Sequence, residues 1–334
     1  MRVAVFSTES YDEEYLSAAN RGKGHEMVFY KPALNRSTAG LAYGFEAVCV
    51  FVHDQIDRST LEQLKEGGVK LVALRCAGFN NVDLVAAHEL GIPVVRVPAY
   101  SPHAVAEHAV ALILTLNRKT HKAYNRVREG NFSLERLTGY DLHRKKVGVV
   151  GTGKIGSAFA EIMLGFGCRV TAFDKYPQEY LKEKGVRYVS LEQLFSESDI
   201  ISLHCPLTPE THKIINRDTI GMMKKGVMII NTSRGKLISS SAMLRGLRDR
   251  KIGYLGMDVY SQEENLFFKD LSEIIIDDEV IGQLMTFPNV LITAHQAFFT
   301  REALEEIAVT TIRNLDDFQQ RGVLENEVKT DVMR

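Results

Sequence analysis

Arg234, Glu263 and His295 are three side chains of this sequence that together could bind and protonate a small keto acid. Each follows an apolar run that is typical of a buried strand. The planar guanidinium of arginine binds a carboxylate through two hydrogen bonds, and histidine gives or takes a proton near neutral pH. A carboxylate beside the histidine stabilises the imidazolium. Taken singly, each also has an ordinary interpretation, as a surface ion-pair member, a solvated acid or a loop histidine.

A glycine-rich turn supplies the second chemical element. Gly151, Gly153 and Gly156 follow an apolar strand and open an amphipathic helix over residues 154–165. In this pattern the first glycine permits a tight turn, the second lets the backbone approach a pyrophosphate, and the third lets the helix pack on the strand. Unpaired N–H groups at the helix start attract phosphate. The turn therefore predicts a dinucleotide site, because strand, turn and helix occur in the required order.

Asp174 ends the next predicted strand, residues 169–173, and lies eighteen residues after the last glycine of the turn. A carboxylate at this place accepts from the ribose 2′-OH of NAD and repels the 2′-phosphate of NADP, an exclusion that Lys175 could soften. With a nicotinamide bound, Arg234 would hold the substrate carboxylate while His295 protonates the ketone oxygen and Glu263 keeps His295 charged. NADH would deliver hydride to the carbonyl carbon, and the steps would reverse for the alcohol.

The first hundred residues alternate short valine-rich apolar runs with helical intervals. Because the runs are continuously apolar rather than alternating, they indicate a parallel sheet covered on both faces. The predicted strands are residues 3–6, 27–30, 47–52, 69–74 and 93–97, and the predicted helices are residues 11–19, 59–66 and 82–90.

The alternation resumes after Asp174, and each predicted strand ends in a polar or glycine-bearing loop. Arg234, Glu263 and His295 lie on three of these loops. Ligands of open parallel sheets bind at the carboxyl ends of the strands. We therefore expect the loops to face the cofactor, which strengthens the chemical interpretation of the three charged residues. The predicted strands after Asp174 are residues 199–204, 228–231, 254–259 and 290–293, and the strand before the glycine turn is residues 147–150.

A long helix follows a linker at residues 97–103. Ser101 is a suitable N-cap and Pro102 suits the first helical position, so we predict a helix from there to about residue 128. Its two apolar stripes must be covered on two sides. Its own domain could cover both, but we favour a second subunit packing against half of the helix.

The predicted fold class is α/β, with two Rossmann-like or flavodoxin-like parallel-sheet domains. A helix over residues 300–320 would return to the first domain. The nucleotide-binding domain, residues 101–297, would then be inserted into a substrate-binding domain made of residues 1–100 and 298–334. The cleft between them would be the active site, with hinges near residues 98–101 and 297–300.

The composition argues against several classes of partner and of binding site. The 334 residues carry 41 Lys+Arg against 42 Asp+Glu with no basic block, which argues against nucleic acid or an anionic membrane as a partner. No apolar stretch is long enough to span a bilayer and the start does not resemble a signal peptide, so we expect a cytoplasmic protein. The four cysteines lie far apart without a C-x-x-C pair, which argues against a disulfide framework or a zinc site. No metal is expected.

Seven motifs are distributed along the chain: residues 75–83 (RCAGFNNVD), 94–100 (VVRVPAY), 151–156 (GTGKIG), 204–208 (HCPLT), 231–235 (NTSRG), 257–260 (MDVY) and 295–298 (HQAF). Together they resemble the NAD-dependent D-2-hydroxyacid dehydrogenases, most closely the D-lactate dehydrogenase branch. The family's catalytic trio is the arginine of the S-R-G loop, a glutamate five residues after the D-V-Y aspartate, and the histidine of the H-x-A loop. These fall on Arg234, Glu263 and His295, and counting from Asp258 selects Glu263 over the adjacent Glu264.

The resemblance also implies contacts to the substrate and the cofactor. The backbone N–H groups of Ala77 and Gly78 would assist Arg234 with the substrate carboxylate. Tyr100 would donate its hydroxyl and Phe298 would close a small apolar pocket, although both could also pack at the hinge. The residues implied to line the cofactor, besides the three glycines and Asp174, are Lys154, Ile155, Cys205, Pro206, Thr211, Thr232, Ser233, Arg234 and Asp258.

Two histidines fall on no catalytic position of the family. We expect His108 and His204 to be structural. Residues 261–262 are Ser-Gln where relatives often carry acids, a departure that should not affect the chemistry.

The activity implied by the resemblance is the reversible, NADH-dependent reduction of pyruvate to D-lactate, as in fermentation, by a homo-oligomer (dimer or tetramer). Two alternatives stay open. The substrate could be a larger 2-oxo acid, such as hydroxypyruvate or a branched-chain acid, although Tyr100 and Phe298 favour a small one. The chain could instead be an NAD-sensing binding protein, since some members of the superfamily serve as transcriptional corepressors. Loss of NADH absorbance on adding pyruvate separates the classes.

Overall fold

The chain folds into two compact units, and the computed structural model describes residues 1–263 and 266–329. One unit comprises Met1–Ser101 and Phe299–Arg334, and the other comprises Pro102–Phe298. Each is built on a parallel sheet, and the second interrupts the sequence of the first. This confirms the predicted α/β fold with one parallel-sheet domain inserted into another. The assignment of substrate binding to the first unit and of the catalytic trio to the second remains a prediction.

The first unit contains a five-stranded sheet in the order β2-β1-β3-β4-β5, with every neighbouring pair parallel. Its two strands β3 and β4 are apolar runs that are buried on both faces, as expected for the interior of a parallel sheet. All five lie where the apolar runs predicted them. They are β1 (Arg2–Val5), β2 (Glu26–Phe29), β3 (Ala47–Val50), β4 (Leu71–Leu74) and β5 (Val94–Arg96).

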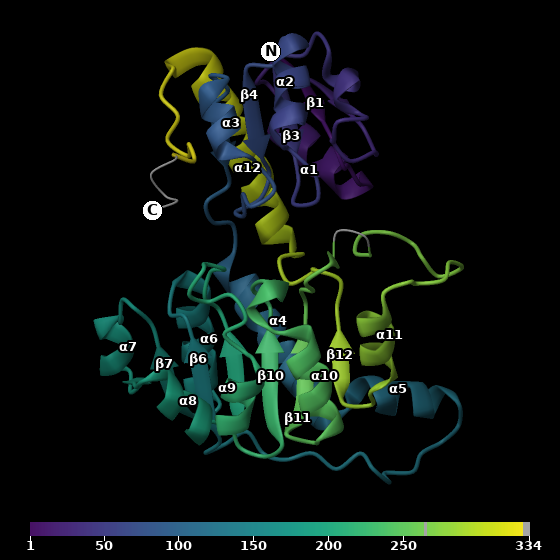
Figure 1. The fold of residues 1–334 in the computed structure, drawn as a ribbon, viewed down its shortest axis with the longest axis vertical. Coiled ribbons are helices and arrows are strands. Elements are labelled where there is room, and N and C mark those ends of the chain that lie inside the picture. Colours follow the sequence, from purple (N-terminus) through teal and green to yellow (C-terminus); the bar gives the residue numbers. More distant parts are fainter. Residues whose placement is uncertain (264–265, 330–334) are drawn as a thin grey trace. The chain divides into compact units, whose positions relative to one another are not determined.

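The helix that returns to the first unit belongs to its core. Ala308, Ile312 and Leu315 of α12 pack with apolar residues of β1, β3, β4 and α1, and Figure 1 shows the yellow α12 beside the strands from the start of the chain. The Thr300 hydroxyl caps this helix by accepting from the Ala303 N–H at 3.3 Å. The helices of this unit are α1 (Ser10–Ala19), η1 (Ala39–Ala42), α2 (Arg58–Glu66), α3 (Leu84–Glu89), α12 (Arg301–Asp316) and η4 (Asp317–Arg321), a π-helical turn.

The second unit contains a seven-stranded sheet in the order β12-β11-β10-β9-β6-β7-β8, again parallel throughout. From β6 the sheet continues to β7 on one side, and the later strand β9 pairs with β6 on the other side. Open α/β sheets bind their ligands at such a point, where the strand order reverses. The short edge strand β8 was not predicted. The strands are β6 (Lys146–Val150), β7 (Arg169–Phe173), β8 (Arg187–Tyr188), β9 (Ile200–Leu203), β10 (Val227–Asn231), β11 (Ile252–Met257) and β12 (Val290–Ile292).

Helices cover both faces of this sheet (Figure 1). Met228 and Ile230 of β10 pack toward α4 and α6, whereas Ile229 between them packs toward α8, α9 and α10. Successive strand residues point to opposite faces, so both faces must be covered. The helices are α4 (Pro102–Arg118), α5 (Thr120–Arg128), α6 (Lys154–Gly165), α7 (Glu179–Glu183), α8 (Leu191–Glu197), α9 (Arg217–Met222), η2 (Gly235–Leu237), α10 (Ser240–Arg248) and α11 (Glu279–Thr286).

The predicted single helix from Pro102 to about residue 128 is wrong. The helix ends at Arg118, the backbone of Lys119 is left-handed with a φ of 53°, and α5 starts at Thr120. The two apolar stripes of α4 are both buried by the unit's own sheet and by α6. The residues of these two stripes are therefore covered within the chain. The contact of half of the predicted helix with a second subunit stays a prediction.

No helix among the described residues has both the length and the hydropathy needed to cross a bilayer. All four cysteines are buried and none of them forms a disulfide.

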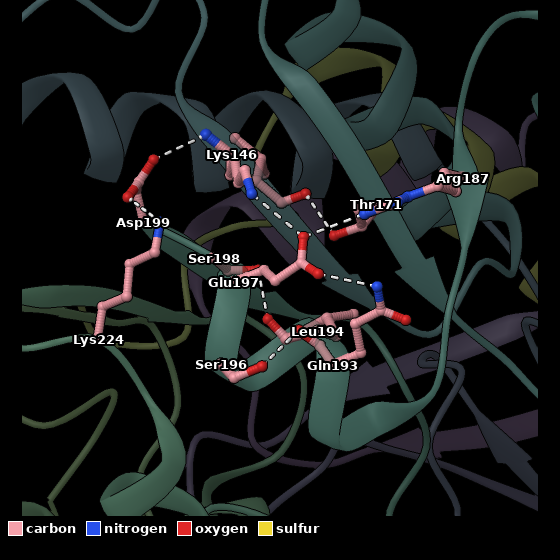
Figure 2. A network of polar contacts seen from close by, with 11 residues as sticks. Lys146, Thr171, Arg187, Gln193, Leu194, Ser196, Glu197, Ser198, Asp199 and Lys224 are labelled. Carbon is pink, nitrogen blue, oxygen red and sulfur yellow. Dashed lines mark hydrogen bonds and ion pairs between the residues drawn. The ribbon is translucent and has the colours of Figure 1, made fainter.

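An ionic network joins the amino-terminal ends of the strands in the second unit. Figure 2 shows Lys146, Arg187 and Gln193 converging on the Glu197 carboxylate, at 3.2, 3.1 and 2.8 Å. Lys146 starts β6, Arg187 starts β8 and Glu197 ends α8, so the carboxylate ties three elements together. Hydrogen bonds from Gln193 and Lys146 lower the Glu197 pKa to about 2. The network lies at the edge opposite to the carboxyl ends of the strands, where we expect stability rather than chemistry.

We expect Glu197→Gln to lower the melting temperature at pH 7 by about 1–3 °C, since the pair is solvent-exposed. A carboxylate with a lowered folded-state pKa contributes stability above its unfolded pKa, and this contribution disappears as the pH falls toward about 2. The difference between parent and variant should therefore shrink between pH 4.5 and pH 2. Melting curves across this range, with the exposed Glu183→Gln as control, measure it. An equal difference at every pH would contradict the prediction.

Candidate active site

The glycine turn has the geometry that a pyrophosphate requires. Gly151 follows β6 with a φ of 93°, and a Cβ on Gly156 would lie 1.9 Å from the Gly151 carbonyl oxygen, so a side chain fits at neither position. Around Gly153, the N-cap of α6, a Cβ would meet nothing within 4 Å. The turn thus leaves open space directly before the first N–H groups of a twelve-residue helix. Lys154 and Ile155 form the start of that helix.

Asp174 is held against this turn. Its Oδ2 accepts from the Thr152 N–H at 2.5 Å and from the Thr152 hydroxyl at 3.1 Å, and its Oδ1 accepts from the Tyr176 N–H at 2.8 Å. The Tyr188 hydroxyl of β8 donates to the Thr152 hydroxyl at 2.9 Å. Thr152 and Tyr188, which fix the acid beside the glycines, were not predicted from the sequence. The carboxylate remains partly exposed, as an acceptor for a ribose hydroxyl must be.

The loop after β10 contains a buried polar atom without a hydrogen-bond partner among the described residues. This atom is the Thr232 hydroxyl oxygen. A buried hydroxyl without a partner is unfavourable, and a ligand at this position would supply one. Beside it, the Ser233 hydroxyl donates to the Cys205 carbonyl at 2.7 Å and so joins the two loops. Together with the open space at Gly153, this fits the dinucleotide predicted from the sequence.

Thr211 and His204, in the segment that follows β9, are hydrogen-bonded to residues of the same part of the chain. The Thr211 hydroxyl donates to the Pro206 carbonyl at 2.7 Å and closes the loop on itself. The imidazole of His204 lies against Ser202, with Oγ and Nε2 2.8 Å apart, and burial lowers its pKa to about 3. A ring that stays neutral in the core fits the structural role expected for His204. Burial also raises the pKa of the Cys205 thiol to about 11.

His295 and Glu263 form a direct pair. The histidine Nδ1 lies 3.0 Å from Glu263 Oε1, and Glu263 Oε2 accepts from the Tyr260 N–H at 2.9 Å. Both side chains are about four-fifths buried, with 19% and 23% of their surfaces exposed. The carboxylate fixes Nδ1 as the protonated nitrogen and leaves Nε2 for a substrate. The other acid considered, Glu264, lies outside the described residues.

A buried aspartate shapes the loop that carries His295. Asp258 is fully buried, and its carboxylate accepts from the N–H groups of Gln296 and Ala297 at 2.9 and 2.8 Å and from the Thr293 hydroxyl at 2.5 Å. The Asp258 carbonyl accepts from the His295 N–H at 2.8 Å. These bonds hold His295 in a left-handed backbone with φ 52°. The implied contact of Asp258 with a cofactor stays a prediction.

His108 of α4 is a member of the same network. Its Nε2 lies 3.0 Å from the Thr293 hydroxyl and 3.4 Å from Asp258 Oδ1. This is consistent with a structural role. The partners of His108 could not be predicted from the sequence, because Thr293 is 185 residues away.

Arg234 lies on the loop after β10. Its backbone carbonyl accepts from the Asn231 amide at 2.9 Å, and its Nη1 donates to the Ser233 carbonyl at 2.8 Å, the one hydrogen bond of its guanidinium among the described residues. The next residue, Gly235, packs so closely that a Cβ would lie 2.1 Å from the Tyr260 carbonyl carbon. The Arg234 loop therefore lies against the loop that leads to Glu263.

Arg234, Glu263 and His295 follow β10, β11 and β12, three neighbouring strands of one sheet. All three belong to the second unit, as does Phe298, which is buried. The arrangement offers a guanidinium for a carboxylate and an imidazole, oriented by a carboxylate, for proton transfer. No cluster of His, Cys, Asp or Glu suited to a metal ion occurs among residues 1–263 and 266–329.

Ala77, Gly78 and Tyr100 belong to the first unit and follow β4 and β5. The Gly78 and Ala77 carbonyls accept from the Cys76 thiol at 3.3 Å and from Arg96 Nη1 at 2.8 Å. The N–H groups of Ala77 and Gly78 have no partner among the described residues. Both amides are thus available to an anion.

The base of this loop is fixed by a buried arginine. Arg75 is almost fully buried, and its Nη1 and Nη2 donate to the carbonyls of Phe6 and Ser7 at 2.9 and 2.6 Å. Its Nε pairs with Asp12 at 3.1 Å. Arg75 therefore orders the strand ends from which the loop with the free amides departs.

The chain is similar to known dehydrogenases along its length. The family model of the NAD binding domain of D-isomer specific 2-hydroxyacid dehydrogenases matches residues 110–297. The D-lactate dehydrogenase of Escherichia coli (strain K12) is 54% identical over 328 residues, which cover 98% of this chain and all of the relative.

Solved structures agree with this similarity. The apo-structure of D-lactate dehydrogenase from Escherichia coli aligns with a TM-score of 0.91 at 52% identity, over 98% of this chain and 100% of that one. The D-lactate dehydrogenase from Aquifex aeolicus, complexed with NAD and lactic acid, aligns with a TM-score of 0.87 at 36% identity, over 98% of each chain.

Proposed function

Since the chain belongs to the NAD-dependent D-isomer specific 2-hydroxyacid dehydrogenases, we propose that it is a cytoplasmic D-lactate dehydrogenase that reversibly reduces pyruvate. The observation that carries the chemistry is the 3.0 Å contact between His295 Nδ1 and Glu263 beside the Arg234 loop. The relatives named for D-lactate and the structure with lactic acid support the choice of substrate.

Arg234 binds the pyruvate carboxylate, because its guanidinium has donors that are not used within its own loop. The free N–H groups of Ala77 and Gly78 are the further donors proposed for that carboxylate. Tyr100 and Phe298 are proposed as the neighbours of the substrate hydroxyl and methyl positions. A carboxylate bound through two hydrogen bonds by one guanidinium has a single orientation. This orientation presents one face of the C2 carbonyl to the hydride donor.

His295 transfers the proton. With Nδ1–H donating to Glu263, the protonated Nε2 gives its proton to the carbonyl oxygen during reduction and takes it from the alcohol during oxidation. Glu263 stabilises the imidazolium before the transfer. NADH, when bound at the glycine turn, supplies the hydride that reduces C2. Exclusion of water around this step is expected, because hydride transfer needs close and ordered reactants.

The test is an absorbance assay with a substrate panel. NADH should be consumed on adding pyruvate, with kcat/KM higher than for hydroxypyruvate or a branched-chain 2-oxo acid. A larger acid turned over better than pyruvate would replace the substrate and keep the enzyme class. Binding of NADH without turnover of any 2-oxo acid would leave the NAD-sensing binding protein as the function.

Asp174 sets the cofactor preference. We expect Asp174→Asn to raise the KM for NADH about tenfold, because a charged acceptor for the ribose is replaced by a neutral one. Activity with NADPH should rise, because the repulsion of its 2′-phosphate is removed. Initial rates with both cofactors, and the exposed Asp141→Asn as control, measure this. An unchanged ratio of the two kcat/KM values would show that Asp174 does not read the ribose.

We also propose that the protein is a homo-oligomer, through a surface that includes α5, the second half of the helix predicted from Pro102 to about residue 128. Tyr124 and Val127 of α5 and Phe132 and Leu134 of the following loop expose between 52% and 82% of their surfaces. Clustered exposed apolar groups are typical of subunit contacts. Sedimentation should show an oligomer, and Phe132→Asp with Leu134→Asp should dissociate it, whereas Met285→Asp should not. A monomeric parent protein at micromolar concentration would contradict the proposal.

A further inference from the structure

A polar cavity lies in the second unit and is not lined by the catalytic trio. It has a volume of about 870 Å³ and is formed by α9, α10 and the segments that precede β10 and β11. Four cations line it, together with two serine hydroxyls. They are Arg217, Lys225, Arg245, Lys251, Ser239 and Ser241.

The cations of this cavity exceed its acids. Two carboxylates, Asp218 and Asp249, also line it, so the lining has a surplus of two positive charges. Asp249 lies 3.7 Å from Arg245 Nε and offsets that charge. Arg217 and Lys225 have neither an ion-pair nor a hydrogen-bond partner within the described part of the chain. Exposed cations are normally solvated, but two of them facing one concave space attract an anion more strongly than either alone.

Three residues with small or no side chains, here called the floor, also line the cavity. They are Gly221, Ala242 and Gly246, and a Cβ on Gly221 would meet nothing within 4 Å. Lys251 Nζ donates to the Gly221 carbonyl at 3.0 Å, which holds one cation at the edge of the floor. The volume falls in the range of small-molecule sites in proteins, roughly 300–1,000 Å³.

We propose that this cavity binds a small anion carrying two linked phosphate groups. Arginine binds phosphate oxygens in pairs, lysine binds them as a point charge, and serine hydroxyls donate to them, so the set matches phosphate better than an apolar or cationic ligand. Arg217 begins α9 and Lys225 follows its end, so the two unpaired cations are separated and can each bind one of two linked phosphate groups. A nucleotide base or sugar attached to it has room in the remaining volume.

The cavity is connected to the catalytic loops by short contacts. Ser239 and Ser241 flank the start of α10, five and seven residues after Arg234. The Ser240 hydroxyl lies 3.4 Å from that of Ser261, and Gly235 packs directly on Tyr260, whose N–H binds Glu263. An anion that draws Ser239 and Ser241 toward the cations would therefore move the loops of Arg234 and Glu263. This regulatory consequence rests on the roles proposed for those two residues, whereas the binding does not.

Calorimetric titration of the full chain with inorganic pyrophosphate, at constant ionic strength, tests the binding. Saturating NADH is present throughout, so that the glycine turn is already filled. We expect one site in the parent protein. Arg217→Ala combined with Lys225→Ala should weaken it at least about tenfold, because charge-assisted hydrogen bonds are lost. Arg169→Ala, an exposed arginine of β7 in the same unit, should leave it unchanged.

A second variant keeps the test independent of any folding defect. Gly221→Glu places a carboxylate in the open space of the floor and should also abolish pyrophosphate binding while NADH binding persists. No heat at millimolar pyrophosphate in the parent, or equal affinity in the parent and the double variant, would overturn the proposal. Equal binding of monophosphate or sulfate would overturn its diphosphate selectivity.

The regulatory consequence has its own readout. Saturating pyrophosphate should change the KM for pyruvate at least twofold in the parent and not in the double variant, in which the cations are absent. Binding with an unchanged KM would contradict the coupling to Arg234. Binding in a protein that does not turn over pyruvate would count against the proposed function alone, so the two failures are distinguishable.

Discussion

His295→Gln is expected to lower kcat for pyruvate reduction by about 10²–10⁴-fold, because general acid catalysis by a positioned side chain contributes that much. Glutamine has the size to fill the position and can donate a hydrogen bond, but it cannot transfer a proton at neutral pH. The Kd for NADH should change little, since the glycine turn and Asp174 are formed by other elements. Steady-state rates and a fluorescence titration with NADH measure the two quantities.

The control for this prediction is another histidine of the same unit. His103 lies exposed on the first turn of α4, and His103→Gln should keep kcat within about twofold, as surface changes normally do. If kcat of His295→Gln falls less than about tenfold, a proton donor other than His295 must act. A large fall in NADH affinity would instead indicate that the loop of His295 has lost its structure.

Substitution of Glu263 and of Glu264, one at a time, tests which of the two acids orients His295. We expect Glu263→Gln to lower kcat by about 10–10³-fold, because the amide can hold the ring in the wrong tautomer and adds no charge to stabilise the imidazolium. The same substitution at Glu264 should have a much smaller effect. In the structure His295 contacts Glu263, so the reverse result would assign the orienting role to Glu264.

Sequence alone was sufficient for the five-stranded sheet, for most strands of the seven-stranded sheet and for the glycine turn. Buried parallel strands are apolar on both faces, so β3 and β4 appear as uninterrupted apolar runs. The positions of Gly151 and Gly156 are equally informative, because no other residue fits there. Strand β8 gave no such signal. It has two residues, Arg187 and Tyr188, and exists because it pairs with β7.

The break between α4 and α5 could not be predicted from local sequence. Lys119 is a good helix former and neither glycine nor proline is near. The chain turns there in the folded unit, where Asn117 donates to the Tyr140 carbonyl at 2.7 Å and Lys119 donates to the Thr138 carbonyl at 2.6 Å. These partners are about twenty residues away, so the break depends on tertiary contacts.

The same distinction holds for the site. The Glu263–His295 contact was expected, because both residues were placed at the ends of neighbouring strands, and the pair lies at 3.0 Å. The support for that pair was not expected. Asp258 reaches Thr293 and Ala297, and His108 reaches Thr293, only because α4, β11 and β12 pack together. Residue types at strand ends indicate the chemistry, whereas the residues that hold it in place depend on long-range packing.

Arg234→Lys is expected to raise the KM for pyruvate by about 10–100-fold, because one charge-assisted hydrogen bond contributes about 1.5–3 kcal/mol. Lysine keeps the positive charge but loses the planar fork that binds both carboxylate oxygens. The structure adds a second reason. Nη1 of Arg234 already donates to the Ser233 carbonyl at 2.8 Å, which orients the guanidinium in its loop, and a lysine can make that bond only by giving up a donor to the substrate.

The effect should fall on substrate binding more than on the chemical step. A carboxylate contact is made in the ground state and in the transition state, so its loss raises KM with a smaller change in kcat. Arg169→Lys, at the exposed start of β7, is the matched control and should leave both constants unchanged. An Arg234→Lys enzyme with the parent KM would show that the substrate carboxylate is bound elsewhere, and the amides of Ala77 and Gly78 would then be the donors to test next.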